Sequence, residues 1–224
     1  ISNLDYSNSY SYHGVLISMY SNARLKFIDF FDTLNKSNEL SIDIKAIHFN
    51  YLWDVIFKQN QLLDSDAKKF ESYHNDMIHE SVICISKDNI YIHENAIVSA
   101  GTILDASNGP IIIDKDATID IGSLIQGPVY IGIDSLINPG TKLRGNIAIG
   151  TKCKIGGELE DVTVQAYSNK QHDGFLGHSF IGEWVNLGAN TNNSDLKNNY
   201  SSIRINLTKD LEINTMQQFL GVFI

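Results

Sequence analysis

The chain has 224 residues, 43% of them hydrophobic, and its 26 acidic residues outnumber 17 lysines and arginines for a formal net charge of -9. This balance excludes a general basic surface for nucleic acid, and no stretch approaches the roughly 18 apolar residues of a membrane-spanning helix. The only cysteines, Cys84 and Cys153, are too few for a disulfide framework or a metal site. The composition is typical of a globular protein of the reducing cytoplasm.

The first third of the chain predicts mixed α/β structure. Residues 15–17 and 42–47 have the composition of short strands, and residues 23–35 and 52–63 have helical spacing, with Asp64 and Ser65 as a stop signal. We expect residues 1–75 to be part of an α/β domain with its exit helix, and residues 76–91 to be a polar connection. Because this domain is thin and the chain opens at Ile1 without Met, we also expect a fragment of a longer protein.

An internal repeat of six residues dominates the second half of the chain. Isoleucine or leucine stands at eight successive sixth positions: Ile113, Ile119, Ile125, Ile131, Ile137, Leu143, Ile149 and Ile155. A small or β-branched residue follows most of them by four places, as at Ala117, Ser123, Val129, Ser135, Thr141 and Cys153. The same spacing holds in an earlier run, Ile92, Val98 and Leu104, which is offset from the main series by three extra residues near 108–110. It resumes later at Ile181 and Leu187.

A strict period of six fits neither a helix nor a single strand, and it predicts short strands joined at corners. Three hexads make one triangular coil, and stacked coils about 4.8 Å apart pair each strand with the coil above and below. The sequence therefore predicts a mainly β protein, with a parallel β-helix over residues 92–224. The spacing itself leaves the handedness of the coil open.

The repeat breaks after Ile155, and residues 167–178 are rich in polar and charged side chains. Departures from a packed repeat are typical places for a site. His172 is the first candidate, because histidine titrates near neutral pH and can take a proton from an amine or hydroxyl nucleophile. The alternative is an exposed histidine in a turn, and for His178 a place at a corner is the favoured interpretation.

Further polar residues follow the break. A stretch rich in asparagine runs from Asn186 to Asp195 and lines either a sugar site or the corners of the coils. Lys170 and Arg204 are cations suited to a substrate phosphate or to solvation. A basic stripe fits either the phosphates of coenzyme A or a neighbouring chain; its members are Lys142, Arg144, Lys152 and Lys154. Phosphate-loop and serine-hydrolase motifs are absent from the sequence.

With these residues in view, the stretch 167–200 resembles a signature of the bifunctional sugar-1-phosphate nucleotidyltransferases with a hexapeptide acyltransferase tail, in the variant typical of Bacteroidetes. The resemblance covers roughly residues 52–224. It implies a left-handed β-helix that acetylates the amine of glucosamine 1-phosphate from acetyl-CoA, usually as a homotrimer. It also implies a preceding domain that joins UTP to N-acetylglucosamine 1-phosphate with Mg²⁺, whose ligands are not identifiable in this sequence.

The resemblance also implies roles for individual residues. His172 corresponds to the general base, and Lys170 and Asn186 correspond to substrate contacts, to which we add Asp195 and Arg204 as predicted substrate-binding residues. Phe175 departs from the family pattern, because the better-known members have tyrosine there. Two alternatives stay open: a β-helix that serves only as an assembly or regulatory scaffold for a nucleotidyltransferase, and a carbonic-anhydrase-like protein with a metal held by histidines between subunits.

Overall fold

The computed structural model describes residues 10–12, 15–18, 42–43, 47–75 and 78–224, and its contacts divide the chain into Ile1–Phe49 and Asn50–Ile224. In the first unit, β1 (Tyr10–Tyr12) pairs antiparallel with β2 (Val15–Ser18) and parallel with β3 (Ile42–Asp43). The strand predicted at 15–17 is confirmed, and the one predicted at 42–47 begins where expected. The helix predicted at 23–35 lies outside the described residues.

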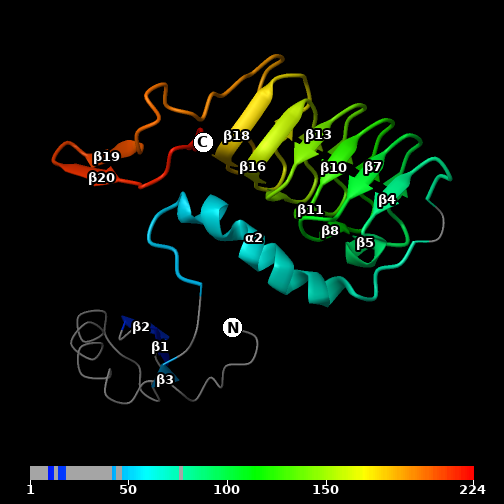
Figure 1. The fold of residues 1–224 in the computed structure, drawn as a ribbon, viewed down its shortest axis with the longest axis horizontal. Helices are drawn as coiled ribbons and strands as arrows, with labels where there is room; N and C mark the ends of the chain where they lie inside the picture. The colour runs from blue at the N-terminus through cyan, green and yellow to red at the C-terminus, as the bar shows by residue number, and fades with distance from the viewer. Residues whose placement is uncertain (1–9, 13–14, 19–41, 44–46, 76–77) are drawn as a thin grey trace. The chain divides into compact units, whose positions relative to one another are not determined.

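The second unit is a parallel β-solenoid with three faces (Figure 1). The first face has β4 (Ile83–Ile85), β7 (Ile103–Asp105), β10 (Leu124–Gln126) and β13 (Lys142–Arg144). The second face has β5 (Ile90–Ile92), β8 (Ile111–Ile113), β11 (Val129–Ile131) and β14 (Ile147–Ile149). The third face has β6 (Ile97–Val98), β9 (Thr118–Ile119), β12 (Leu136–Ile137), β15 (Lys154–Ile155) and β17 (Asn169–Lys170). Two longer strands, β16 (Glu158–Val164) and β18 (Phe175–Ile181), run through both the first and second faces.

The predicted inward positions form the core of this solenoid. The isoleucines and leucines of the eight successive hexads are at most 1% exposed. Leu124 pairs with Lys142 and Val129 with Ile147, a spacing of three hexads, so equivalent side chains stack directly on one another. The predicted β-helix is confirmed. The extra residues predicted near 108–110 are also confirmed. Ile103 pairs with Leu124, and the spacing between these two partners is longer than three hexads.

Helix α2 (Asp54–Ala67) and the 3₁₀ turn η2 (Lys68–Phe70) lie against the coils (Figure 1). Ile56 and Leu63 are buried on α2, and between them the Gln59 amide nitrogen donates to the main-chain oxygen of Asn146 at 2.6 Å. The helix runs past the stop predicted at 64–65. It belongs with the solenoid, whose first strand begins at Ile83, so the solenoid unit starts earlier than the sequence predicted.

A buried carboxylate fastens the segment after η2 to the second face. Asp114 is 6% exposed, and its two oxygens accept the hydroxyls of Tyr73 and Tyr130, each at 2.8 Å. Burial and the hydrogen bond to Asp114 raise the pKa of Tyr73 to about 12 and move the pKa of Tyr130 above its usual range. Both phenols therefore stay neutral donors at physiological pH.

After β18 the chain continues the coil, with parallel bridges from Asn186 to Asn169 and from Asn193 to Leu176, and it then leaves the solenoid and returns. The excursion carries a hairpin of β19 (Arg204–Thr208) and β20 (Leu211–Asn214). Its end pairs with β18, because the Gly221 nitrogen donates to the oxygen of His178 at 2.8 Å and the Ile224 nitrogen donates to that of Phe180 at 3.0 Å. Within the described ranges, no helix has both the length and the apolar character needed to cross a bilayer.

Candidate functional site

The break in the repeat is a shortened corner between the third and first faces. Ile137 pairs with Ile155 and Lys142 with Glu158, so the corner at Gly156 and Gly157 has two residues fewer than the corner in the coil below. A Cβ on Gly156 would collide with the main-chain oxygen of Gln171. Glycine is therefore required here, since the main chain of residues 171–174, the corner of the next coil, folds directly over this point.

Lys170 occupies an inward position of the third face. It pairs with Ile155 in the stack that also contains Ile119 and Ile137, and it is only 3% exposed. Its ammonium reaches the corner, where Nζ donates to the main-chain oxygens of Gly156 at 3.0 Å and His172 at 2.7 Å. Burial lowers the pKa of this ammonium, and the charge of Asp173 partly opposes that effect. The ammonium thus binds main-chain carbonyls and fixes the corner 171–174.

His172 lies at the tip of this corner and is exposed. Lys170 holds its main-chain oxygen, whereas within the described part of the chain its imidazole has no hydrogen-bond partner. An imidazole in this position is able to accept a proton from an external nucleophile. The structure therefore brings together Lys170 and His172, two residues that the sequence singled out, and among the described residues no carboxylate is bonded to the ring of His172.

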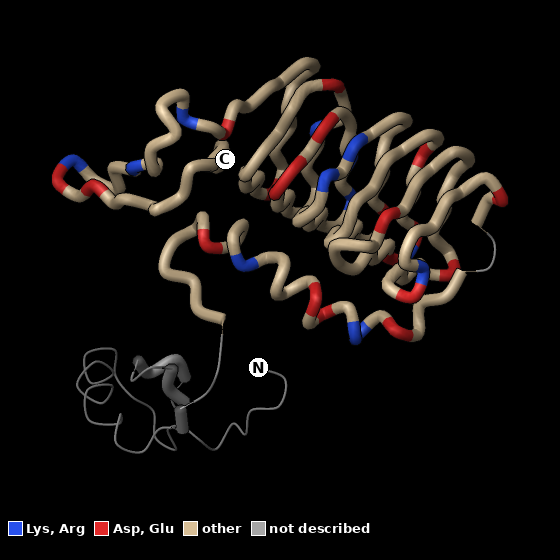
Figure 2. Tube along the Cα trace, viewed as in Figure 1, with Lys and Arg blue, Asp and Glu red and all other residues tan. Residues whose placement is uncertain are grey.

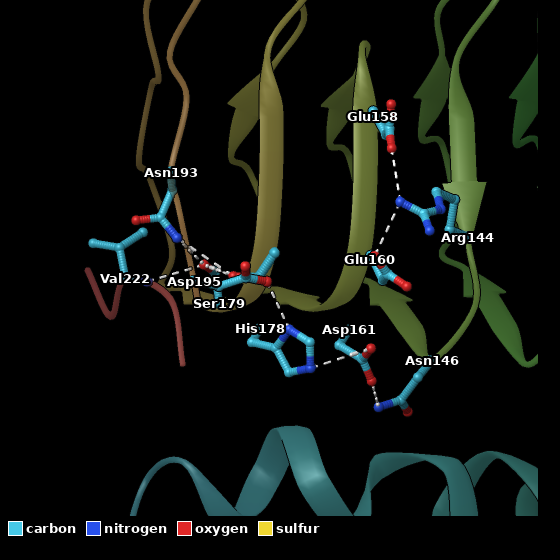
Figure 3. Close-up of polar contacts among 11 residues, drawn as sticks. Arg144, Asn146, Glu158, Glu160, Asp161, His178, Ser179, Asn193, Asp195 and Val222 are labelled. Atoms are coloured by element: carbon cyan, nitrogen blue, oxygen red, sulfur yellow. Dashed lines mark hydrogen bonds and ion pairs between the residues drawn. The ribbon is translucent and has the colours of Figure 1, made fainter. Parts of the chain in front are cut away.

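The histidine that does have carboxylate partners is His178 (Figure 3). Its Nδ1 lies 2.8 Å from Oδ2 of Asp195, and its Nε2 lies 3.5 Å from Oδ2 of Asp161. The Nδ1 contact is a hydrogen bond, whereas the Nε2 contact is longer. Asp195, a predicted substrate contact, is therefore a hydrogen-bond partner of His178, and its side chain is 11% exposed.

The surroundings of His178 join three parts of the second unit. The ring stacks on Phe219 of the returning segment at 5.2 Å between centroids and faces Phe57 of α2 at 6.1 Å. Asn146 donates to Oδ1 of Asp161 at 2.6 Å and to the Ile56 oxygen of α2 at 2.9 Å. This enclosed network fastens α2 and the excursion to the coils, which is a structural role.

The sequence analysis missed this network, although the sequence contains a signal for it. Asp161, His178 and Asp195 follow one another at a constant interval, the same interval that separates the paired residues of β16 and β18. Side chains one coil apart lie in adjacent rungs, so a histidine with an aspartate one coil away on each side predicts a contact. This interval is one residue shorter than three full hexads, so a search at the strict period misses the network, and only the register of β16 and β18 reveals it.

The remaining predicted residues lie in different places. Asn186 is exposed and forms an isolated bridge with Asn169 of β17, and the Asn169 amide donates to its Oδ1 at 3.5 Å. It thus extends the third face beyond β17, the strand that leads to His172. Arg204 lies on the hairpin, where Nη1 pairs with Oε1 of Glu212 at 2.8 Å. No contact joins Arg204 to the corner among the described interactions.

The predicted basic stripe is divided between two faces. Lys142 and Arg144 belong to β13 on the first face, and Lys154 belongs to β15 on the third. Arg144 lies between Glu158 and Glu160, at 2.9 Å and 3.1 Å. Figure 2 shows acidic residues interspersed among the basic ones along the coils. No continuous positive surface follows from these four residues.

Comparison with known proteins does not assign the chain to a family. No protein-family model and no curated protein matches the chain. Across the parts of the chain that the structure describes, no three His, Cys, Asp or Glu side chains converge in a way that would hold a metal ion. The assignment of a function therefore depends on the corner itself and on the resemblance noted above.

Replacing Lys170 with methionine tests the role of its ammonium. We expect a similar melting temperature, because methionine fills the same inward position and burial already disfavours the charge. Exchange of the Gly156 and Glu158 amide hydrogens, which donate to the main-chain oxygens of Lys170 and Gly174 across this corner, should rise about tenfold or more, since a hydrogen bond from a charged group contributes about 1.5–3 kcal/mol. Hydrogen–deuterium exchange measures this change, with Lys154→Met on the exposed side of β15 as control. Unchanged exchange in Lys170→Met would show that Nζ does not hold the corner.

Proposed function

We propose that the solenoid is the acyl-transfer part of a sugar-phosphate transferase, which acetylates the amine of an amino-sugar phosphate from acetyl-CoA. The observation that carries this proposal is the exposed imidazole of His172, on a corner fixed by Lys170 and folded over Gly156. The resemblance of residues 167–200 to a family with this activity supports it. The parallel solenoid is compatible with it.

In the proposed reaction, the amine nitrogen of the sugar attacks the thioester carbonyl of acetyl-CoA, and His172 takes a proton from that amine. The new C–N bond forms, the C–S bond breaks, and the sulfur leaves as coenzyme A thiol after taking up a proton. Asn186 is the proposed contact to the sugar, because its side chain is exposed beyond β17 on the same face. Lys170 acts as a positioning residue, Asp195 has the structural role described for the His178 network, and Arg204 stays a predicted phosphate contact.

Nucleotidyl transfer is the second part of the proposal. The family resemblance supports an additional reaction between UTP and N-acetylglucosamine 1-phosphate with Mg²⁺. We assign none of the described residues to that reaction or to its metal ion. Of residues 1–75, which we predicted to belong to a nucleotidyltransferase-like domain, only residues 1–49 lie outside the solenoid unit, and they carry this part of the proposal.

An assembly scaffold is the second candidate, and a row of exposed apolar side chains favours it. On the first face, Ile83 is 53% exposed, Ile85 is 43% exposed and Leu124 is 42% exposed. Adjacent apolar side chains of this kind are typical of contacts between chains. We therefore propose that copies of the protein pack side by side, as a homotrimer by resemblance, whether or not the corner is catalytic.

Release of thiol from acetyl-CoA tests the two candidates against each other. We expect release that depends on glucosamine 1-phosphate, and none with N-acetylglucosamine 1-phosphate, whose amine is already acetylated. The matched acceptors separate acyl transfer from simple hydrolysis of the thioester. An absence of release, together with an oligomer in sedimentation, would overturn the acetyltransferase and leave the scaffold.

A further inference from the structure

One corner of the solenoid carries an unusual series of residues. Between the second and third faces, equivalent positions of five successive coils adopt left-handed backbone with φ between 56° and 62°, and they are occupied by Asp116, Asp134, Lys152, Tyr167 and Trp184. Aspartate and asparagine tolerate this conformation, whereas a bulky aromatic residue there is an outlier. The last two coils thus place the least suitable side chains at a strained position.

These two aromatic side chains lie outside the hydrophobic core. Tyr167 is 40% exposed and Trp184 is 77% exposed, and their rings stack at 4.8 Å between centroids with an interplanar angle of 14°. The backbone strain is therefore not offset by a place in the core. Backbone strain at a surface position, where no core packing offsets it, is typical of a functional position. The result is a flat platform of two stacked rings, with most of the indole open to solvent.

The side chains near the platform indicate which ligands it suits. Two residues further along each coil, Asn169 and Asn186 present side-chain amides that lie next to each other. The lysines of this corner and its flank, Lys115, Lys152 and Lys154, are matched in number by the acidic residues Asp116, Asp134 and Glu183, and Lys152 lies 3.9 Å from Asp134. The corner therefore carries no net charge, which gives no electrostatic advantage to a nucleotide or another polyanion.

We propose that the Tyr167–Trp184 platform binds the pyranose ring of an uncharged saccharide, with the amides of Asn169 and Asn186 as hydrogen-bond partners for its hydroxyl groups. An aromatic face offers a large, rigid and amphipathic surface to the C–H face of a sugar ring, and an amide both donates and accepts. The site lies at the start of β17, whereas His172 follows its end, and Asn186 is the one residue that we assign to both sites. Binding at the platform does not require acetyl transfer.

Tryptophan fluorescence tests the proposal directly, because the chain has 2 tryptophans and Trp53 is only 7% exposed. In a Trp53→Phe background, the emission comes from Trp184. We expect triacetylchitotriose or maltotriose to change it saturably, and UTP to have a weaker effect. In Trp184→Asn, calorimetry should give binding about tenfold weaker or undetectable.

Trp184→Asn also separates binding from folding. Asparagine tolerates the left-handed backbone, so the melting temperature should be unchanged or higher. Three outcomes would overturn the proposal: no saturable response to either trisaccharide up to about 10 mM, at the weak end of specific affinities; tighter binding of UTP than of both sugars; or dissociation of an oligomer in Trp184→Asn, which would make the platform an interface between copies.

Discussion

Replacing His172 with alanine should lower kcat/KM for acetyl transfer to glucosamine 1-phosphate about 10²-fold or more, because a positioned general base contributes about 10²–10⁴-fold. The loss should appear mainly in kcat, since the imidazole acts on the proton that moves in the transition state. The side chain is exposed and its ring has no hydrogen-bond partner within the described residues, so the folded structure should be retained. Thiol release and the melting temperature, measured on the same preparations, check both statements.

A matched control for this variant is His79→Ala. His79 is also exposed, and its ring contacts the Ser81 hydroxyl at 2.8 Å in the first coil, several coils before the corner. We expect the control to keep the full rate. Equal rates in the two variants would place the base elsewhere, and a loss confined to KM would make His172 a binding residue.

Replacing Ile137 with alanine should destabilise the solenoid by about 2–5 kcal/mol, the usual cost of removing a buried isoleucine side chain beyond Cβ. Ile137 is fully buried and pairs with Ile119 below and Ile155 above, so the vacated space has neighbours on both sides. The rigid spacing of the coils prevents collapse into that space, because neighbouring strands hold one another by main-chain hydrogen bonds. Urea unfolding followed by circular dichroism measures the change.

The control for the core is Ile97→Ala on the same face. Ile97 is 58% exposed and points away from the stack. Its loss should change stability by less than about 0.5 kcal/mol. A comparable loss in the two variants would mean that the outer surface of this face is covered, as in an assembly of several chains, and that the stack is not the main source of stability.

The fold was predictable because the period of six reports the core directly. Each inward isoleucine meets its equivalent one coil away, so the pattern in the sequence is the pattern of contacts. The start of the solenoid was harder to predict from the sequence. Its first coil pairs Ile83 with Ile103, a spacing slightly longer than three hexads and therefore outside the strict period. Likewise, the place of α2 depends on Gln59 reaching Asn146, a contact that no local pattern reveals.

The candidate site was predictable only in part, for a physical reason. The break after Ile155 located the shortened corner, and His172 lies on the corner that folds over it. Lys170 has the sequence context of a surface cation, because the coil that joins it to Ile155 is shorter than the three full hexads that separate Ile137 from Ile155. A polar residue after a change of register can face inward, and only the backbone path shows which way it points.

The corners of the solenoid are also the places where its chain length can change during evolution. Three extra residues are accommodated near 108–110 and two are lost at Gly156–Gly157, yet the parallel strand pairing continues across both. The long excursion with the β19–β20 hairpin likewise ends in a parallel bridge between Phe223 and Phe180 of β18. Chain length can therefore vary at a corner while the stacked strands keep their alignment. In evolutionary terms, insertions and deletions at corners offer this protein new binding surfaces without requiring a new core.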